Sequence, residues 1–289
     1  MRLWLSLNMQ THSNLLHMVK TGTEGPTLVF IPGLSGTTRY WEGRLGALAA
    51  NHRVLLMDPL GFGDSPKPWS RYTVDRHVDA LYESLKNEKR FVLIGHSMGT
   101  LLSIAYAARH PEQVERLVLL SIPFFGGARE AQRFFSSQPV PFGWFFSNMA
   151  LAAVVCIITR RVFGRLMPYL RRDLPREVAA DIVKHSWRSF TSSFWEVICN
   201  YDVKTDADAL GDLPVLSIHG DKDDTAPLSG ALALADGRPT WTTHILPGVD
   251  HHPWFRFPEI CQRDVDTGFP FVSFAPENLP LRRDVLAVL

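Results

Sequence analysis

One stretch of the sequence, residues 91–99 (FVLIGHSMG), limits the possible folds more than any other. A continuous apolar run of strand length meets Gly-x-Ser-x-Gly and passes directly into a small-residue pattern typical of a helix. A serine in such a turn adopts a strained backbone, and Gly95 and Gly99 are needed because larger side chains would collide across the bend. The turn exposes the Ser97 hydroxyl to a cleft and places the N–H of Met98 at a helix N-terminus. A nucleophilic serine with an adjacent donor for a developing oxyanion is therefore predicted.

Strands and helices alternate on both sides of this turn. Helical spacing predicts helices over residues 40–50 and 73–85, the second capped by Thr73 or Asp75. This alternation favours a mostly parallel central sheet with helices on both faces, the α/β class. Besides the strand at the turn, strands are expected at residues 3–8, 15–20, 27–31, 52–57, 115–121, 213–219 and 240–246.

Composition narrows the range of partners. The chain has 289 residues, 30 basic and 29 acidic, so its formal net charge of +1 indicates neither a nucleic acid nor a highly charged membrane surface as a partner, and membrane association is not expected. Cys156, Cys199 and Cys261 lie far apart, which gives no zinc pattern and favours a reducing compartment. No export signal is evident in the first residues, so a cytoplasmic location is expected. A small, apolar or weakly charged substrate fits these features best.

The motifs together resemble the α/β-hydrolase fold superfamily. The resemblance is carried by Gly-His-Ser-Met-Gly around Ser97, a Pro-Gly loop upstream, and Gly-x-x-Asp and Gly-x-x-His downstream, and it covers roughly residues 20–260. It has a gap over residues 123–205. The resemblance implies a core formed by residues 1–122 and 206–289, a helical cap formed by residues 123–205, and an activity that needs neither a cofactor nor a metal.

A serine needs a base, and the base needs an orienting group, in the chain order serine, acid, histidine. The family pattern Gly-x-x-Asp, with Pro227 four residues later, selects Asp223 over its neighbours Asp221 and Asp224. Gly-x-x-His selects His251 over His252. A single loop histidine is more often structural than catalytic, so spacing and chain order carry this choice. His96, beside the serine, is expected to pack within the turn.

The loop 32–36 (PGLSG) follows a buried strand and resembles the loop that supplies a second oxyanion donor in the family. The resemblance assigns that donor to the backbone N–H of Leu34. Pro32 stands where many relatives have histidine, and it should reshape the loop without removing this N–H. A plain strand-to-helix turn is the structural alternative.

The expected cap is rich in aromatic and arginine residues. Residues 142–158 are almost entirely apolar, but 17 residues are short for a membrane span, so a buried or interfacial helix pair is favoured over a transmembrane helix. Aromatic side chains of the cap could line an apolar cavity or simply pack against one another. The candidates for substrate contact are Trp144, Phe145 and Trp195, with Trp187 and Phe194 beside them.

These features predict a serine hydrolase that cleaves a carboxylic ester with an apolar acyl or aromatic part through an acyl-enzyme. Thioesters, lactones and carbon–carbon bonds remain alternatives for the same three residues. A non-catalytic ligand-binding protein with the same fold is an alternative of another class. Relatives usually end in an amphipathic helix, whereas the pattern after residue 261 is soon broken by glycine and proline, and the tail 261–289 has no predicted role.

Overall fold

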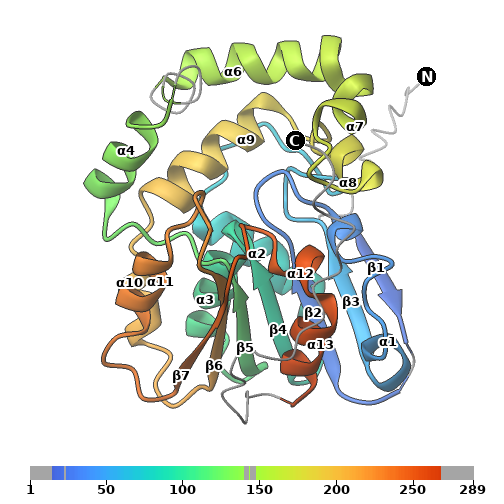
Figure 1. Cartoon of the computed structure of the whole chain (residues 1–289). Coiled ribbons are helices and arrows are strands. Elements are labelled where there is room, and N and C mark those ends of the chain that lie inside the picture. The colour runs from blue at the N-terminus through green and yellow to red at the C-terminus, as the bar shows by residue number, and fades with distance from the viewer. Residues whose placement is uncertain (1–14, 23, 140–142, 144–147, 268–289) are drawn as a thin grey trace, which may run out of the picture.

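A computed structural model describes residues 15–22, 24–139, 143 and 148–267. Its centre is a seven-stranded sheet with the order β1-β3-β2-β4-β5-β6-β7 (Figure 1). Only β1 is antiparallel to its neighbour, so the predicted mostly parallel α/β architecture is confirmed. The strands are β1 (Met18–Thr21), β2 (Thr27–Ile31), β3 (Arg53–Met57), β4 (Phe91–His96), β5 (Val114–Leu120), β6 (Val215–Gly220) and β7 (Trp241–Leu246).

Two hydrophobic cores lie on opposite faces of the sheet because successive strand residues point to opposite sides. In β2, Val29 and Ile31 join one core, whereas Leu28 and Phe30 join the other. The first core is covered by α2 (Val74–Leu85), α3 (Met98–Arg109), α10 (Val203–Asp208) and α11 (Leu228–Ala235). The second is covered by α1 (Leu48–Asn51), α8 (Arg176–Asp181), α12 (Pro253–Arg256) and α13 (Pro258–Thr267).

The helix expected over residues 40–50 is not formed. The segment instead contains a short 3-10 helix, η1 (Thr38–Tyr40), and one turn of α-helix, α1. Gly43 and Gly46 between them have φ of 71° and 47°, which interrupts the helical path. The other predicted helix is present as α2, and the Thr73 side chain caps it by accepting a hydrogen bond from the Arg76 N–H.

The chain after Pro258 also differs from the expectation, because α13 continues as a helix to Thr267. Its inward face contains Cys261, Val265 and the fully buried Asp264. The Asp264 carboxylate bonds His244 Nδ1 of β7 at 2.5 Å and Arg263 at 3.0 Å. The helix was missed because a buried carboxylate occupies a position where an apolar residue would have signalled the pattern.

The helices between β5 and α10 lie above the carboxyl ends of the strands (Figure 1). The stretch 142–158 is described only in part, and its described helix, α6, has ten residues. Within the described ranges, every helix is too short or too polar to span a lipid bilayer. These elements are α4 (Ala128–Ser136), α6 (Met149–Ile158), η2 (Thr159–Phe163), η3 (Gly164–Leu166), α7 (Met167–Leu170), α8, α9 (Trp187–Ser193) and η4 (Phe194–Cys199).

Candidate active site

The turn between β4 and α3 has the strained geometry that its sequence predicts. Ser97 has φ of 51° and ψ of −123°, a conformation that non-glycine residues rarely adopt. A side chain at Gly95 would place its Cβ 2.5 Å from the Gly99 carbonyl oxygen, and one at Gly99 would approach the Ile31 carbonyl oxygen to 2.3 Å. Both glycines are therefore required by close backbone contacts. The Ser97 N–H donates to the Leu120 carbonyl at 2.9 Å, which ties the turn to β5.

The structure brings Ser97, His251 and Asp223 together. The Ser97 Oγ lies 3.0 Å from His251 Nε2, and His251 Nδ1 lies 2.8 Å from Asp223 Oδ2 and 3.0 Å from Oδ1. The three residues follow β4, β7 and β6, whose carboxyl ends meet at one edge of the sheet. The Gly220 Cα packs so closely on the loop after β7 that an added Cβ would lie 2.1 Å from the Val249 carbonyl oxygen. This contact sets the two loops side by side.

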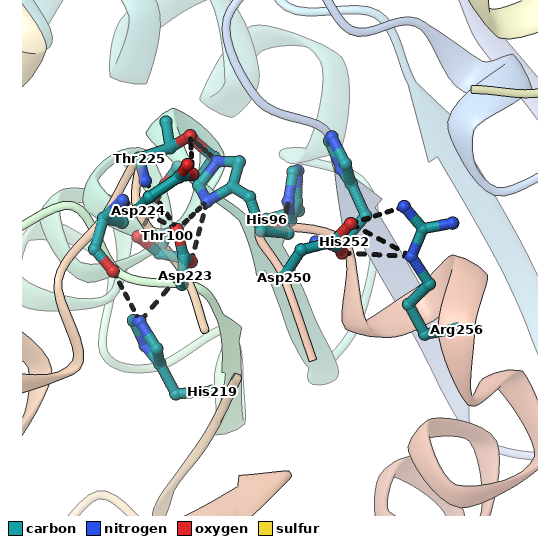
Figure 2. A network of polar contacts seen from close by, with 12 residues as sticks. His96, Thr100, His219, Asp223, Asp224, Thr225, Asp250, His252 and Arg256 are labelled. Carbon is teal, nitrogen blue, oxygen red and sulfur yellow. Dashed lines mark hydrogen bonds and ion pairs between the residues drawn. The ribbon is translucent and has the colours of Figure 1, made fainter. Parts of the chain in front are cut away.

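Asp223 is held as a buried carboxylate. Its Oδ1 accepts hydrogen bonds from the N–H groups of Thr225 at 3.0 Å and Ala226 at 2.8 Å (Figure 2). Burial raises the pKa of Asp223, but the hydrogen bond and charge of His251 and the Ala226 N–H outweigh it, so the pKa is below its usual value. The carboxylate can thus accept a hydrogen bond from the Nδ1–H of His251 and stabilise the imidazole when it becomes positively charged.

The neighbouring acids have other partners. Asp221 accepts a hydrogen bond from the Gly248 N–H at 2.6 Å, and the exposed Asp224 contacts the Thr225 hydroxyl at 3.4 Å. Neither carboxylate bonds His251. The buried His219 does approach Asp223, with Nε2 at 3.5 Å from Oδ2 and 2.8 Å from the Ala226 carbonyl oxygen. His219 therefore supports the acid from the side opposite His251.

The loop 32–36 lies directly against the serine. In the sheet Ile31 is paired with Gly95, and a Cβ at Gly33 would lie 2.9 Å from the Ser97 Cβ. In the described part of the chain, the N–H groups of Leu34 and Met98 have no hydrogen-bond acceptor. Both N–H groups are thus unpaired near Ser97, as the donors of an oxyanion hole would have to be.

A stack of rings behind His251 was not expected from the sequence. His96 Nε2 bonds the His251 carbonyl oxygen at 2.8 Å, and the Tyr40 ring stacks on His96 with centroids 4.4 Å apart. The Tyr40 hydroxyl lies 3.4 Å from His252 Nδ1. As expected, His96 packs within the turn, and its ring bonds the His251 backbone and not the Ser97 hydroxyl. Long-range contacts of this kind leave no spacing signal, because the ring-stack residues come from three separate segments.

Asp250 fixes the other side of the same loop. Its carboxylate accepts from the His252 N–H at 3.0 Å and from Arg256 Nε at 3.0 Å (Figure 2). Asp250 and His252 stand on either side of His251, so the backbone that bears this imidazole is held on each side.

The predicted substrate-contact residues are only partly described. Trp144 and Phe145 lie outside the described residues. Trp195 packs in an aromatic cluster that also contains Phe194 and Leu34, which brings it to the candidate oxyanion loop. Trp187 does not belong to this cluster. It packs edge-on against the largely exposed Trp69. A cavity beside the cluster, lined by residues such as Leu101, Phe125 and Ile198, measures about 20 Å³, which is room for about one water molecule.

One group of residues could in principle hold a metal ion. His17, Asp58 and Asp64 place their ligand atoms within 4.8 Å of one another. Asp58 already accepts the N–H groups of Thr38 and Asp64, each at 2.7 Å, and these bonds close the loop after β3. We therefore interpret the group as loop structure.

Buried histidines should make the protein sensitive to acid. Burial lowers the pKa of His77 and His96 to about 3 and that of His185 to about 4. The unfolded chain protonates these rings below about pH 6.5 while the folded protein keeps them neutral, so unfolding takes up protons in this range. The contribution of these neutral histidines to the free energy of unfolding should be fully present above about pH 6.5. It should fall by about 1.4 kcal/mol per pH unit for each histidine as the pH decreases toward 4.

Urea unfolding followed between about pH 7 and pH 5 measures this slope. The Nε2 of His77 lies 3.0 Å from the Ser193 hydroxyl and takes no part in the hydrogen-bonded chain of Ser97, His251 and Asp223, so His77→Gln removes one such group while leaving that chain in place. Unfolding of the variant should take up about one proton fewer than unfolding of the wild type. An unchanged slope would mean that His77 is already protonated in the folded protein.

Comparison with known proteins identifies the fold. A family model described as the alpha/beta hydrolase fold matches residues 26–153. An esterase from Thermogutta terrifontis superposes with a TM-score of 0.69 at 19% identity, over 88% of this chain and 92% of the esterase. The enol-lactonase from Burkholderia xenovorans LB400 gives 0.64 at 23% identity, over 87% and 95%. The chain has the α/β-hydrolase fold. In this fold, the position of the turn at Ser97, between a central strand and the following helix, is that of the nucleophile elbow.

Some curated relatives are considerably longer than this chain. The probable lysophospholipase BODYGUARD 5 of Arabidopsis thaliana is 26% identical over 78% of this chain and 57% of its own length. The chain spans only 54–59% of the first three curated relatives. The similarity therefore extends to the hydrolase core and not to the whole of those proteins.

Proposed function

We propose that the protein is a serine hydrolase that cleaves a carboxylic ester with an apolar acyl or aromatic part. The observation that carries the proposal is the continuous contact from Ser97 Oγ through the His251 imidazole to the buried Asp223 carboxylate. The elbow, the free N–H groups and the aromatic cluster at Leu34 support it. The relatives named as an esterase, an enol-lactonase and probable lysophospholipases are consistent with this class.

The reaction follows from the geometry. His251 Nε2 takes the proton of Ser97 as Oγ bonds the carbonyl carbon, and the carbonyl oxygen becomes negative between the N–H groups of Leu34 and Met98. The imidazolium returns the proton to the leaving alkoxide as the ester bond breaks, which leaves an acyl group on Ser97. Water, deprotonated by the same imidazole, then releases the acid and restores the serine. Asp223 stabilises the positive imidazole in both halves.

An ester is proposed in preference to a thioester or a lactone because the curated relatives described above are named as probable lysophospholipases, and a lysophospholipid is a carboxylic ester. The same three side chains could open any of these bonds. A panel of p-nitrophenyl esters, acyl thioesters and lactones of increasing acyl length separates them. The highest kcat/KM for a thioester or lactone would replace the ester proposal while retaining the nucleophile.

A fluorophosphonate probe tests the nucleophile directly. The probe forms a covalent bond only with an activated serine, so the protein should be labelled to about one equivalent at Ser97, with labelling lost in Ser97→Ala and strongly slowed in His251→Gln. Peptide mapping by mass spectrometry locates the adduct. A ligand-binding protein that only retained the fold would remain unlabelled, and this result would reject the hydrolase proposal.

A further inference from the structure

The outer surface of the cap is unusually apolar. Fourteen large hydrophobic side chains of the described residues are exposed, and ten of them lie between residues 151 and 170. They include Val154, Val162 and Leu170, with 50%, 62% and 59% of their surface exposed. An apolar surface concentrated in one short segment marks an interaction site more often than a scatter of single residues does.

The helix α6 shows how this surface arises. Its inner side, with Ala152 and Cys156 buried, packs against α9, which covers the sheet (Figure 1). The outer side carries Val154 and Ile158, four residues apart and therefore on one face. The helix is thus apolar on both sides, although only the inner side has a partner among the described residues.

The charged residues of the same segment are all basic. Residues 149–172 contain five arginines and no aspartate or glutamate, whereas the whole chain has a net charge of only +1. Arg160 donates to the His185 carbonyl, and Arg171 pairs with Asp173. The side chains of Arg161 and Arg165 are exposed and make no hydrogen bond or ion pair with any residue that the structure describes. Apolar side chains mixed with unpaired arginines are the features of a surface that lies in a lipid headgroup region.

Other occupants match this surface less well. A second copy docked symmetrically would bring the same patch against itself and set these arginines against their copies. Within the chain's own ends, residues 1–14 contain one arginine and no acid, and residues 268–289 contain two acids and two arginines. Neither end offers the excess negative charge that would complement the arginines. An anionic lipid surface supplies both the charge and an apolar phase.

We propose that the outer face of α6, η2, η3 and α7, which we call the cap face, docks on the surface of a bilayer that contains anionic phospholipids. The apolar side chains would enter the boundary of the acyl chains while Arg161 and Arg165 contact the phosphate groups. Binding of this kind lies in the plane of the membrane and needs no spanning helix. It does not depend on the hydrolase proposal, because none of these residues belongs to the Ser97 site.

Docking can be read from a fluorophore at position 162. A Val162→Cys variant of the full chain is labelled with an environment-sensitive dye; Cys156, Cys199 and Cys261 are buried, which confines labelling to the new thiol. Vesicles of phosphatidylcholine, with or without phosphatidylglycerol, carry a lipid-linked quencher. The dye emission should shift to the blue and be quenched only when phosphatidylglycerol is present, and high salt should weaken the response.

Two substitutions and a matched control locate the contact. Arg161→Gln with Arg165→Gln should lower the vesicle partition coefficient by roughly 25-fold, about fivefold per arginine. Lys89→Gln with Arg90→Gln removes two exposed charges next to the start of β4, at the end of the sheet opposite the cap. This control should change the vesicle partition coefficient by less than about twofold. Val154→Ser with Ile158→Ser should weaken binding by roughly tenfold or more.

Three outcomes would overturn the proposal. They are equal binding to neutral and anionic vesicles, no response to either, and a blue-shifted dye before any lipid is added, which would mean that the chain's own end or a second copy covers the cap face. The labelled protein carrying Ser97→Ala should bind vesicles normally. Loss of docking and loss of activity are thereby measured separately.

Discussion

Replacing Ser97 with alanine should lower kcat for hydrolysis of a p-nitrophenyl ester by roughly 10⁵- to 10⁶-fold, because no other group at the site can form the acyl-enzyme. The fold should be unaffected. The removed oxygen bonds only His251 among the described residues, and alanine keeps the same Cβ at φ of 51°. The free energy of unfolding should therefore change by less than about 1 kcal/mol. Steady-state kinetics and urea unfolding of the same preparation measure both quantities.

Ser121 provides a matched control for this substitution. It follows the neighbouring strand β5, is fully buried, has φ of 57°, and its hydroxyl has no hydrogen-bond partner in the described ranges. Ser121→Ala thus removes the same atom from a residue with a similar positive φ at the same edge of the sheet, and kcat should stay within about threefold of the wild type. Comparable losses in the two variants would show that the effect arises from the backbone at this edge and not from a nucleophile.

Local rules were enough to predict the elbow and the central sheet. A strand that runs into Gly-x-Ser-x-Gly leaves the backbone few alternatives, because Gly95 and Gly99 are in contact with carbonyl oxygens that no other side chain could approach. Asp223 and His251 could be named because the resemblance to the family supplies the patterns Gly-x-x-Asp and Gly-x-x-His after two strands, and parallel strands bring their carboxyl ends together. The structure places both within hydrogen-bond distance of the predicted partners.

Features that depend on distant partners could not be predicted. Apolar spacing over residues 40–50 suggested a helix, but Gly43 and Gly46 turn the chain so that Tyr40 reaches His96 and His252. Similarly, the buried Asp264 appears polar in sequence and becomes part of the core only because β7 supplies His244. In both cases the residue contacts a partner more than 15 positions away in the sequence. The periodicity of apolar residues carries no information about such a contact.

Replacing Asp223 with asparagine should lower kcat by about 10⁴-fold while the protein remains folded. The amide oxygen can keep the bonds from the Thr225 and Ala226 N–H groups, which turns the amide NH₂ toward His251 Nδ1. Two donors cannot face each other, so Nδ1 must lose its proton and the imidazole carries a proton on Nε2 instead. That nitrogen then donates to Ser97 and cannot accept its proton. The variant should still bind a substrate analogue with nearly unchanged affinity, because asparagine has nearly the size and shape of aspartate and alters only the base.

Asp221→Asn and Asp224→Asn are the controls for this argument, because both acids lie within two positions of Asp223 in the same loop yet bond other groups. Their kcat values should stay within about threefold of the wild type. A long-range charge effect would lower the rate of all three variants to a similar extent, since each removes one negative charge near the imidazole. A loss confined to Asp223→Asn would instead assign the effect to a single hydrogen bond at His251 Nδ1. A wild-type rate in Asp223→Asn would mean that another group, of which His219 is the nearest, orients the imidazole.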